Sequence, residues 1–313
     1  MLVRATIGAA LIAFLTWRAN LGAVFAALRG ATFGYVAVAY TLVVTALILG
    51  AFRWRPYLRA VGFEISAWNA ICLSLIGSFF NAFLPTGVGG DAYKALRLPR
   101  DKGTVSSAFA SVLLDRAAGV VGMSLLAIIG VASQMAQGHG GAVLVSALGV
   151  AIVVCLTYGV FQIVGRHPDA ASATVRPGLR GRFVLLLRTV ASGTGDRRAT
   201  ARGITMGVVT GMALLGASGF LARALHLSVP LGVMSAVLLL ASVIAVVPLS
   251  INGLGFRESA YVWGLTSSGV GHEEALAFAL LALGAGLASS AVGGLLFAFA
   301  GGSSSAQASR EGR

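Results

Sequence analysis

The sequence ISAWNAICLSLIGSFFNAFLPTGVGGD, which runs from Ile65 to Asp91, decides the fold class. Residues 65–90 carry no charged side chain, and a helix needs roughly 20 such residues to cross the hydrocarbon layer of a bilayer. The end of the run is rich in residues that break or turn a helix, namely Pro85, Gly87, Gly89 and Gly90. We therefore interpret this stretch as a membrane segment that is interrupted near its end.

Long uncharged runs recur elsewhere, at residues 30–52, 140–165, 203–222, 228–256 and 275–300. Hydrophobic residues make up 57% of the chain and charged residues only 11%, whereas soluble proteins carry about 25% charged residues. Backbone polar groups must be paired inside lipid, so these runs should be helices, and the short alternating segments of barrel strands are not seen. With an uncleaved first helix over residues 5–28, the sequence predicts an all-α integral membrane protein. We expect a polytopic helical bundle of about six full spans plus two re-entrant segments.

The basic residues orient these helices, because positive charges stay on the cytoplasmic side. The most basic loop, residues 166–202, is placed in the cytoplasm. Two basic clusters then flank residues 65–84, and a simple span would put one cluster outside. A re-entrant segment over residues 65–90, which enters and leaves from the cytoplasm, removes this conflict. The alternative is a plain span with a basic loop on the outer face. The clusters are Arg53, Arg55 and Arg59 before the segment, and Lys94, Arg97, Arg100 and Lys102 after it.

The second half repeats the pattern, since residues 230–256 form an apolar run that ends in Pro248, Asn252, Gly253 and Gly255. The last span must finish in the cytoplasm, so this second re-entrant segment should enter from the opposite face. Both breaks contain a proline, a Gly-x-Gly, a charge and Ala-Tyr, although the proline spacing differs. We predict an inverted repeat. The predicted divisions are a transmembrane domain over residues 1–300, half-repeats over 33–133 and 203–300, the cytoplasmic loop over 166–202 and a disordered tail over 301–313.

The first break supplies candidates for binding an anion. Its glycines free the backbone to turn and expose N–H groups, which can hold a phosphate together with the N-terminus of a helix that begins near Asp91. Lys94 would follow on that helix, with Arg97 about one turn later. The alternative is a helix-breaking turn whose charges only set topology. The candidates are Asn81, Pro85, Gly87, Gly89, Gly90, Asp91 and Lys94.

Asp115 and Arg116 lie inside an apolar stretch, where charges are costly and usually face a bundle interior or a polar cavity. Adjacent helical residues point about 100° apart, so Asp115 could pair with an arginine of another helix. The alternative is a structural ion pair near the membrane surface. In the second break, Arg257 could bind a phosphate and Glu258 could neutralise it when no ligand is present. The alternative there is an interfacial loop pair; the candidates are Asn252, Gly253, Gly255, Arg257 and Glu258.

Several kinds of chemistry are not indicated. Cys72 and Cys155 lie in apolar runs and the histidines are scattered, so we expect neither a metal nor a cofactor. No nucleophile elbow or paired catalytic carboxylates stand out, so we do not expect an enzyme. The net charge of +13 would suggest nucleic acid for a soluble protein. In a membrane protein, basic loops set topology and meet anionic headgroups, so no nucleic-acid partner is expected.

Three motifs make the sequence resemble a known family. They read NAFLPTGVGGD at residues 81–91, LDRAAG at 114–119 and PLSINGLGFRE at 248–258. In this order they are similar to the lysylphosphatidylglycerol synthase transmembrane-region family, whose members are often called flippase-like. For its multiple-peptide-resistance members, the resemblance implies a membrane region that moves lysylphosphatidylglycerol between leaflets and a C-terminal domain that makes this lipid. The chain stops soon after its last predicted helix, so we expect a stand-alone member without that domain. Because other stand-alone members are linked to polyprenyl-phosphate sugars and hopanoids, the substrate does not carry over.

The sequence therefore predicts a lipid flippase or lipid-handling transporter of the bacterial inner membrane, with both termini cytoplasmic. Two opposed re-entrant segments would form a polar groove in which Asp115, Arg116, Arg257 and Glu258 contact a phosphate-bearing headgroup of phospholipid or polyprenyl type. The expected partners are anionic or phosphate-bearing membrane lipids, and a homo-oligomer or a membrane-enzyme partner stays open. The alternative is a non-catalytic scaffold for a lipid- or glycan-modifying enzyme that docks on residues 166–202. A membrane enzyme acting on a lipid is the least favoured hypothesis.

Overall fold

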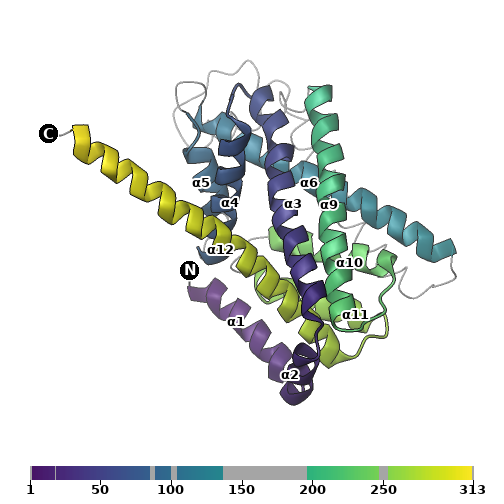
Figure 1. Cartoon of the computed structure of the whole chain (residues 1–313). Coiled ribbons are helices and arrows are strands. Elements are labelled where there is room, and N and C mark those ends of the chain that lie inside the picture. The colour runs from purple at the N-terminus through teal and green to yellow at the C-terminus, as the bar shows by residue number, and fades with distance from the viewer. Residues whose placement is uncertain are drawn as a thin grey trace.

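The computed structural model describes residues 2–17, 19–84, 89–99, 104–136, 196–246 and 253–311. The predicted span over residues 140–165, most of the loop 166–202 and the candidates Pro85, Gly87 and Asn252 lie outside this range. Regular secondary structure in the described residues is entirely helical (Figure 1). The helices are α1 (Leu2–Trp17), α2 (Leu21–Arg29), α3 (Phe33–Ala60), α4 (Ala67–Phe83), α5 (Gly89–Leu96), α6 (Val105–Ala136), α9 (Arg197–Ala224), α10 (Leu231–Val246), α11 (Phe256–Thr266) and α12 (His272–Glu311).

Within the described residues, α3, α6, α9 and α12 are long and apolar enough to cross a membrane. The chain is therefore a polytopic helical membrane protein, as predicted. Helices α1 and α2 could together form one more span, but they meet at 92°. The first helix is thus bent rather than continuous to residue 28, because Asn20 starts a new helix. Its side-chain Oδ1 accepts a hydrogen bond from the Ala23 N–H at 3.3 Å, which caps α2.

The long helices α3 and α9 pack side by side and run antiparallel (Figure 1). Near the C-terminal end of α3, the ring of Tyr57 lies against Gly203, close to the start of α9. At the other end, the Thr32 N–H donates to the Ala224 carbonyl at 2.9 Å, just before α3 begins and where α9 ends. Gly203 permits this approach because a side chain there would overlap the tyrosine ring.

Each predicted broken segment forms a helical hairpin. In the first, α5 folds back along α4, so that Gly90 lies against the Gly77 carbonyl. In the second, Gly264 of α11 lies against Val237 of α10. Because α4 follows the end of α3 and α10 follows the end of α9, the hairpins lie at opposite ends of the antiparallel pair (Figure 1). An inverted repeat requires this relation, and the membrane face that each hairpin enters stays a prediction.

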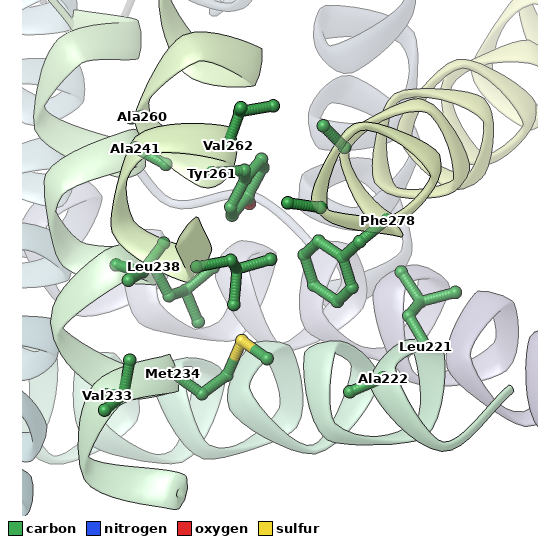
Figure 2. Packing of buried hydrophobic residues seen from close by; sticks show 14 of the residues in the cluster. Leu221, Ala222, Val233, Met234, Leu238, Ala241, Ala260, Tyr261, Val262 and Phe278 are labelled. Atoms are coloured by element: carbon green, nitrogen blue, oxygen red, sulfur yellow. The ribbon is translucent and has the colours of Figure 1, made fainter. Parts of the chain in front are cut away.

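Apolar packing anchors both hairpins to the long helices. Around the second hairpin, Met234 and Leu238 of α10, Tyr261 of α11 and Phe278 of α12 point toward a common core (Figure 2). The rings of Tyr261 and Phe278 meet edge to face at 5.5 Å between centroids. Around the first hairpin, a smaller cluster contains the fully buried Trp54 of α3 together with residues of α5 and α6.

Helix α12 continues to Glu311, and so it includes most of residues 301–313, for which we predicted a disordered tail. The part of α12 that is apolar enough to span a membrane ends at Phe299. No proline interrupts the polar continuation, so nothing in the sequence removes a backbone donor at that point.

Candidate functional site

A cavity of about 430 Å³ lies at the centre of the bundle, and residues of both hairpins contribute to its wall. Every helix except α1 and α2 contributes to the described part of this wall. The wall carries charge, although it lies among helices whose apolar runs would cross a bilayer. In the described residues the lining cations are Arg53, Lys94, Arg116 and Arg257, and the lining carboxylates are Asp91 and Asp115.

Asp115 of α6 is held by Arg53 of α3. The Arg53 Nε donates to Asp115 Oδ1 at 2.7 Å, and its Nη2 donates to Oδ2 at 3.3 Å. Both side chains are largely buried, with exposed fractions of 16% for the arginine and 7% for the aspartate. Gly119 lies against the guanidinium, and a Cβ there would come within 2.6 Å of Arg53 Nη1. This two-point pair fixes the guanidinium and joins two membrane helices.

Arg116 pairs with a different carboxylate, that of Asp91 on α5. Its Nε and Nη2 both contact Asp91 Oδ2, at 2.8 and 2.7 Å. The pair is more open than the first, because 35% of the arginine side chain is exposed. Asp115 and Arg116 thus point to different partners, as their adjacent helical positions predicted. The second pair ties the returning limb of the first hairpin to α6.

In the second hairpin, Glu258 is 1% exposed and serves two partners. Its Oε2 accepts the Gly255 N–H at 2.6 Å and closes the first turn of α11, while Oε1 lies 3.2 Å from Arg257 Nη2. Gly253 and Gly255 have φ values of 74° and 83°, a left-handed conformation that favours glycine. Arg257 itself lines the cavity. Gly286 leaves room beside the Arg257 guanidinium, because even a Cβ built on Gly286 would be 3.9 Å from the nearest guanidinium nitrogen.

Lys94 differs from the other lining cations. Its aliphatic chain lies against Gly77 of α4, and its ammonium lies 5.2 Å from the centroid of the Trp54 ring. In the part of the chain that the structure describes, no carboxylate comes within ion-pair distance of this ammonium. A cation that is enclosed by helices and not directly paired with a carboxylate is a place where an anionic ligand gains most.

Hydroxyl groups line the wall between these charges. The Oγ of Ser74 on α4 is buried and has no hydrogen-bond partner among the described residues. One turn later, the Oγ of Ser78 lies 2.9 Å from the Oγ of Ser290 on α12. Hydroxyls can donate or accept, so this side of the cavity suits uncharged polar groups of a ligand.

Residues 1–294 match a family model that is described as the lysylphosphatidylglycerol synthase TM region. The chain belongs to this family. Over 118 residues it is also 26% identical to the UPF0104 membrane protein PH1989 of Pyrococcus horikoshii, a match that covers 37% of this chain. The match spans 35% of that relative, whose name states only that it is a membrane protein. Membership of the lysylphosphatidylglycerol synthase TM family is consistent with a lipid-related membrane function.

The three motifs that resemble the lysylphosphatidylglycerol synthase TM family meet at this cavity. The first motif and the turn after it supply Asn81, Asp91 and Lys94, the second supplies Asp115 and Arg116, and the third supplies Arg257. Glu258 and the described glycines of the two breaks do not line the cavity, but they shape the backbone that carries the lining residues. These glycines are Gly89, Gly90, Gly253 and Gly255. The Asn81 Oδ1 accepts the Gly90 N–H at 2.8 Å, so it also holds the first hairpin closed.

Arg97 follows Lys94 by about one turn, but the two side chains lie in different surroundings. Arg97 does not join Lys94 at the cavity; it is exposed and stacks over the Tyr93 ring at 5.5 Å. Lys94 lies on the short helix α5, whereas Arg97 follows the last residue of that helix and points to the surface.

The sequence did not identify Arg53 as a cavity residue, nor the serines of the cavity wall, Ser74, Ser78 and Ser290. Arg53 was interpreted as one of the charges that set topology, together with Arg55 and Arg59. A signal was available, because Gly50 and Ala46 precede it on the same helical face and both line the cavity. The serines gave no such signal, since serine in a membrane helix often bonds its own backbone, as Ser289 does with the Ala285 carbonyl at 2.6 Å.

Proposed function

We propose that this chain is a flippase-type lipid transporter that moves a phosphate-bearing lipid between the leaflets of its membrane, which we take to be a bacterial inner membrane. The single observation that carries this proposal is Lys94, which lines a polar cavity inside the bundle and whose ammonium has no carboxylate within ion-pair distance in the described residues. Such a charge is energetically costly inside a bilayer unless a ligand anion neutralises it. The family to which the chain belongs supports a lipid as the ligand.

The other cations would divide into a holding group and a binding group. Arg53 is committed to Asp115 through contacts at 2.7 and 3.3 Å that engage both carboxylate oxygens, so its role is to fix α3 against α6. Arg257 contacts Glu258 only at 3.2 and 3.3 Å, and a guanidinium has five donors, so it retains N–H groups for a phosphate. Lys94 and Arg257 come from opposite hairpins, so a headgroup between them would contact both halves of the repeat.

Transport would follow from this shared contact. A phosphate bound by both hairpins could be exposed first to one side and then to the other as the halves rock, while the acyl chains remain in lipid. The Arg116–Asp91 pair links the first hairpin to α6, and 35% of its arginine side chain is exposed, so it is the contact that such a motion would break most easily. We propose transport without covalent chemistry, so the lipid should leave the protein unchanged.

The test reconstitutes the purified chain in liposomes that contain labelled phosphatidylglycerol or a labelled polyprenyl phosphate. Transfer between leaflets is measured as the fraction of label that becomes accessible to a membrane-impermeant quencher. We expect transfer by the natural chain and about a tenfold loss in Lys94→Ala, because a phosphate contact that is worth one factor of ten is removed. Arg97→Ala is the matched control, since it removes a cation from the same segment but outside the cavity.

Two results would overturn the proposal. One is the absence of transfer of either lipid by natural protein that elutes as a single species and unfolds cooperatively. The other is equal transfer by Lys94→Ala and Arg97→Ala, which would remove the cavity from the transport path. Mass spectrometry of the recovered lipid tests the absence of covalent chemistry, and any change in its mass would revive an enzymatic function.

A further inference from the structure

The pattern of paired and unpaired charged side chains in the cavity indicates the charge of its ligand. We infer that the site takes lipid headgroups whose net charge is negative and rejects headgroups that carry an added ammonium, such as an aminoacylated phosphatidylglycerol. This inference rests on the proposed function and deepens it by naming the substrate class. It also separates this chain from the lipid after which its family is named.

The carboxylates of the site have no charge to spare for a ligand cation. Asp115 is held at two points by Arg53, and Asp91 receives two contacts from Arg116. Glu258 is buried and divided between Arg257 and a backbone N–H. Among the described residues, every carboxylate at the cavity or directly behind it therefore has its own arginine. A ligand ammonium would have to displace one of these arginines before it could be paired.

Lys94 makes the entry of a second cation unfavourable. It is the lining cation without a carboxylate in the described residues, so its charge is felt by whatever occupies the cavity. Like charges repel more strongly in a site that is shielded from water than they do in solution. The positive charge of Lys94 favours the binding of a phosphate and disfavours the binding of the ammonium groups of an aminoacyl ester.

Aromatic faces do not offer an alternative site for a ligand cation. None of the described lining residues is aromatic, and the Trp54 ring behind Lys94 already faces the Lys94 ammonium. An aromatic cage is the usual way in which proteins bind a substituted ammonium without a carboxylate. The wall instead carries the hydroxyl pair of Ser78 and Ser290, which suits the hydroxyl groups of a polyol headgroup.

Phosphatidylglycerol and lysylphosphatidylglycerol provide a matched pair of probes. They share the phosphate, the glycerol and the acyl chains, and they differ only in the lysyl ester. Binding of each lipid to the purified natural chain in detergent is measured by native mass spectrometry, and transfer of each is measured in liposomes. We expect about a tenfold preference for phosphatidylglycerol, which corresponds to one unfavourable charge contact for the lysyl lipid.

Charge reversal tests the assignment to Lys94. Lys94→Glu places an unpaired carboxylate at the cavity, so the preference should fall or invert in favour of the lysyl lipid; Lys94→Gln should be intermediate. Arg97→Glu introduces the same charge change at the exposed face of the same segment and should keep the natural preference.

The outcomes separate the two proposals. If the natural chain handles both lipids equally, or prefers the lysyl lipid, the charge selectivity is overturned while lipid transport stands. An unchanged preference in a folded Lys94→Glu variant would likewise overturn it. If folded natural protein neither binds nor moves either lipid, the proposed function fails and the selectivity fails with it.

Discussion

At the scale of single residues, burial separates the two aspartate–arginine pairs of the cavity. Asp115 and Arg53 are mostly enclosed, whereas Arg116 keeps about a third of its side chain open to the surroundings. Removing one partner of an enclosed pair leaves an unbalanced charge, while an open charge can still be solvated. The two pairs should therefore have different roles, one that holds the helices and one that can open.

We predict that Asp115→Asn lowers the free energy of unfolding by about 3 kcal/mol, because the Arg53 guanidinium loses its partner where it is largely buried. Asp91→Asn should cost less than about 1 kcal/mol, since Arg116 is more open. Thermal unfolding in detergent measures both. The double variant Arg53→Met with Asp115→Leu should recover part of the loss. Equal destabilisation by the two single variants would show that burial does not distinguish the pairs.

At the scale of elements, the first hairpin depends on a close approach of backbones. Gly90 of α5 meets the Gly77 carbonyl of α4, and the Asn81 side chain caps the contact. This approach brings Asp91 and Lys94 to the cavity wall. The hairpin positions the charges of the site only as long as neither backbone carries a side chain at the crossing.

We expect Gly90→Ala to separate the two helices, because its Cβ would overlap the Gly77 carbonyl, which as backbone cannot move aside. Overpacking of this kind costs about 2 kcal/mol. Lipid transfer should fall with the loss of stability. Gly284→Ala in α12 is the matched control, since nothing lies within 4 Å of its Cβ and alanine favours a helix. Thermal unfolding and the liposome assay measure both variants, and a Gly90→Ala protein that matches Gly284→Ala would contradict the close approach.

At the scale of the whole molecule, the antiparallel pair of α3 and α9 carries a hairpin at each end. The hairpins reach the central cavity from opposite ends and contribute cations to it from both directions. Such an arrangement could expose one site alternately to two leaflets without a change in the long helices. Its sidedness follows from whether the first hairpin returns to the face where α3 ends.

Cysteine labelling tests this sidedness. In a background in which Cys72 and Cys155 are replaced by alanine, we expect Arg59→Cys and Arg97→Cys to react with a membrane-impermeant thiol reagent from the same, cytoplasmic side. Both positions are exposed, and they flank the hairpin at its two ends. Reaction from opposite sides would mean that this segment crosses the membrane, and the inverted arrangement would be wrong.

Much of the architecture was predictable because its physical cause is local. An uncharged run of sufficient length must form a helix in lipid, and proline and glycine must interrupt it, whatever its neighbours are. For this reason the long spans α3, α9 and α12, and both hairpin breaks, lie where the sequence predicted them. The same argument identified Asp115 and Arg116 as charges that need a polar surrounding.

The sequence by itself determined that this chain is a helical membrane protein with charged residues inside its apolar segments. Only the tertiary structure decided which charges neutralise one another. Arg53 and Asp115 are 62 residues apart, and helix packing alone brings them together. The same packing points Lys94 to the cavity and Arg97 to the surface. Composition fixes how many charges a chain contains, but pairing depends on distances between segments that are remote in sequence, and therefore the unbalanced cation emerges only in the folded bundle.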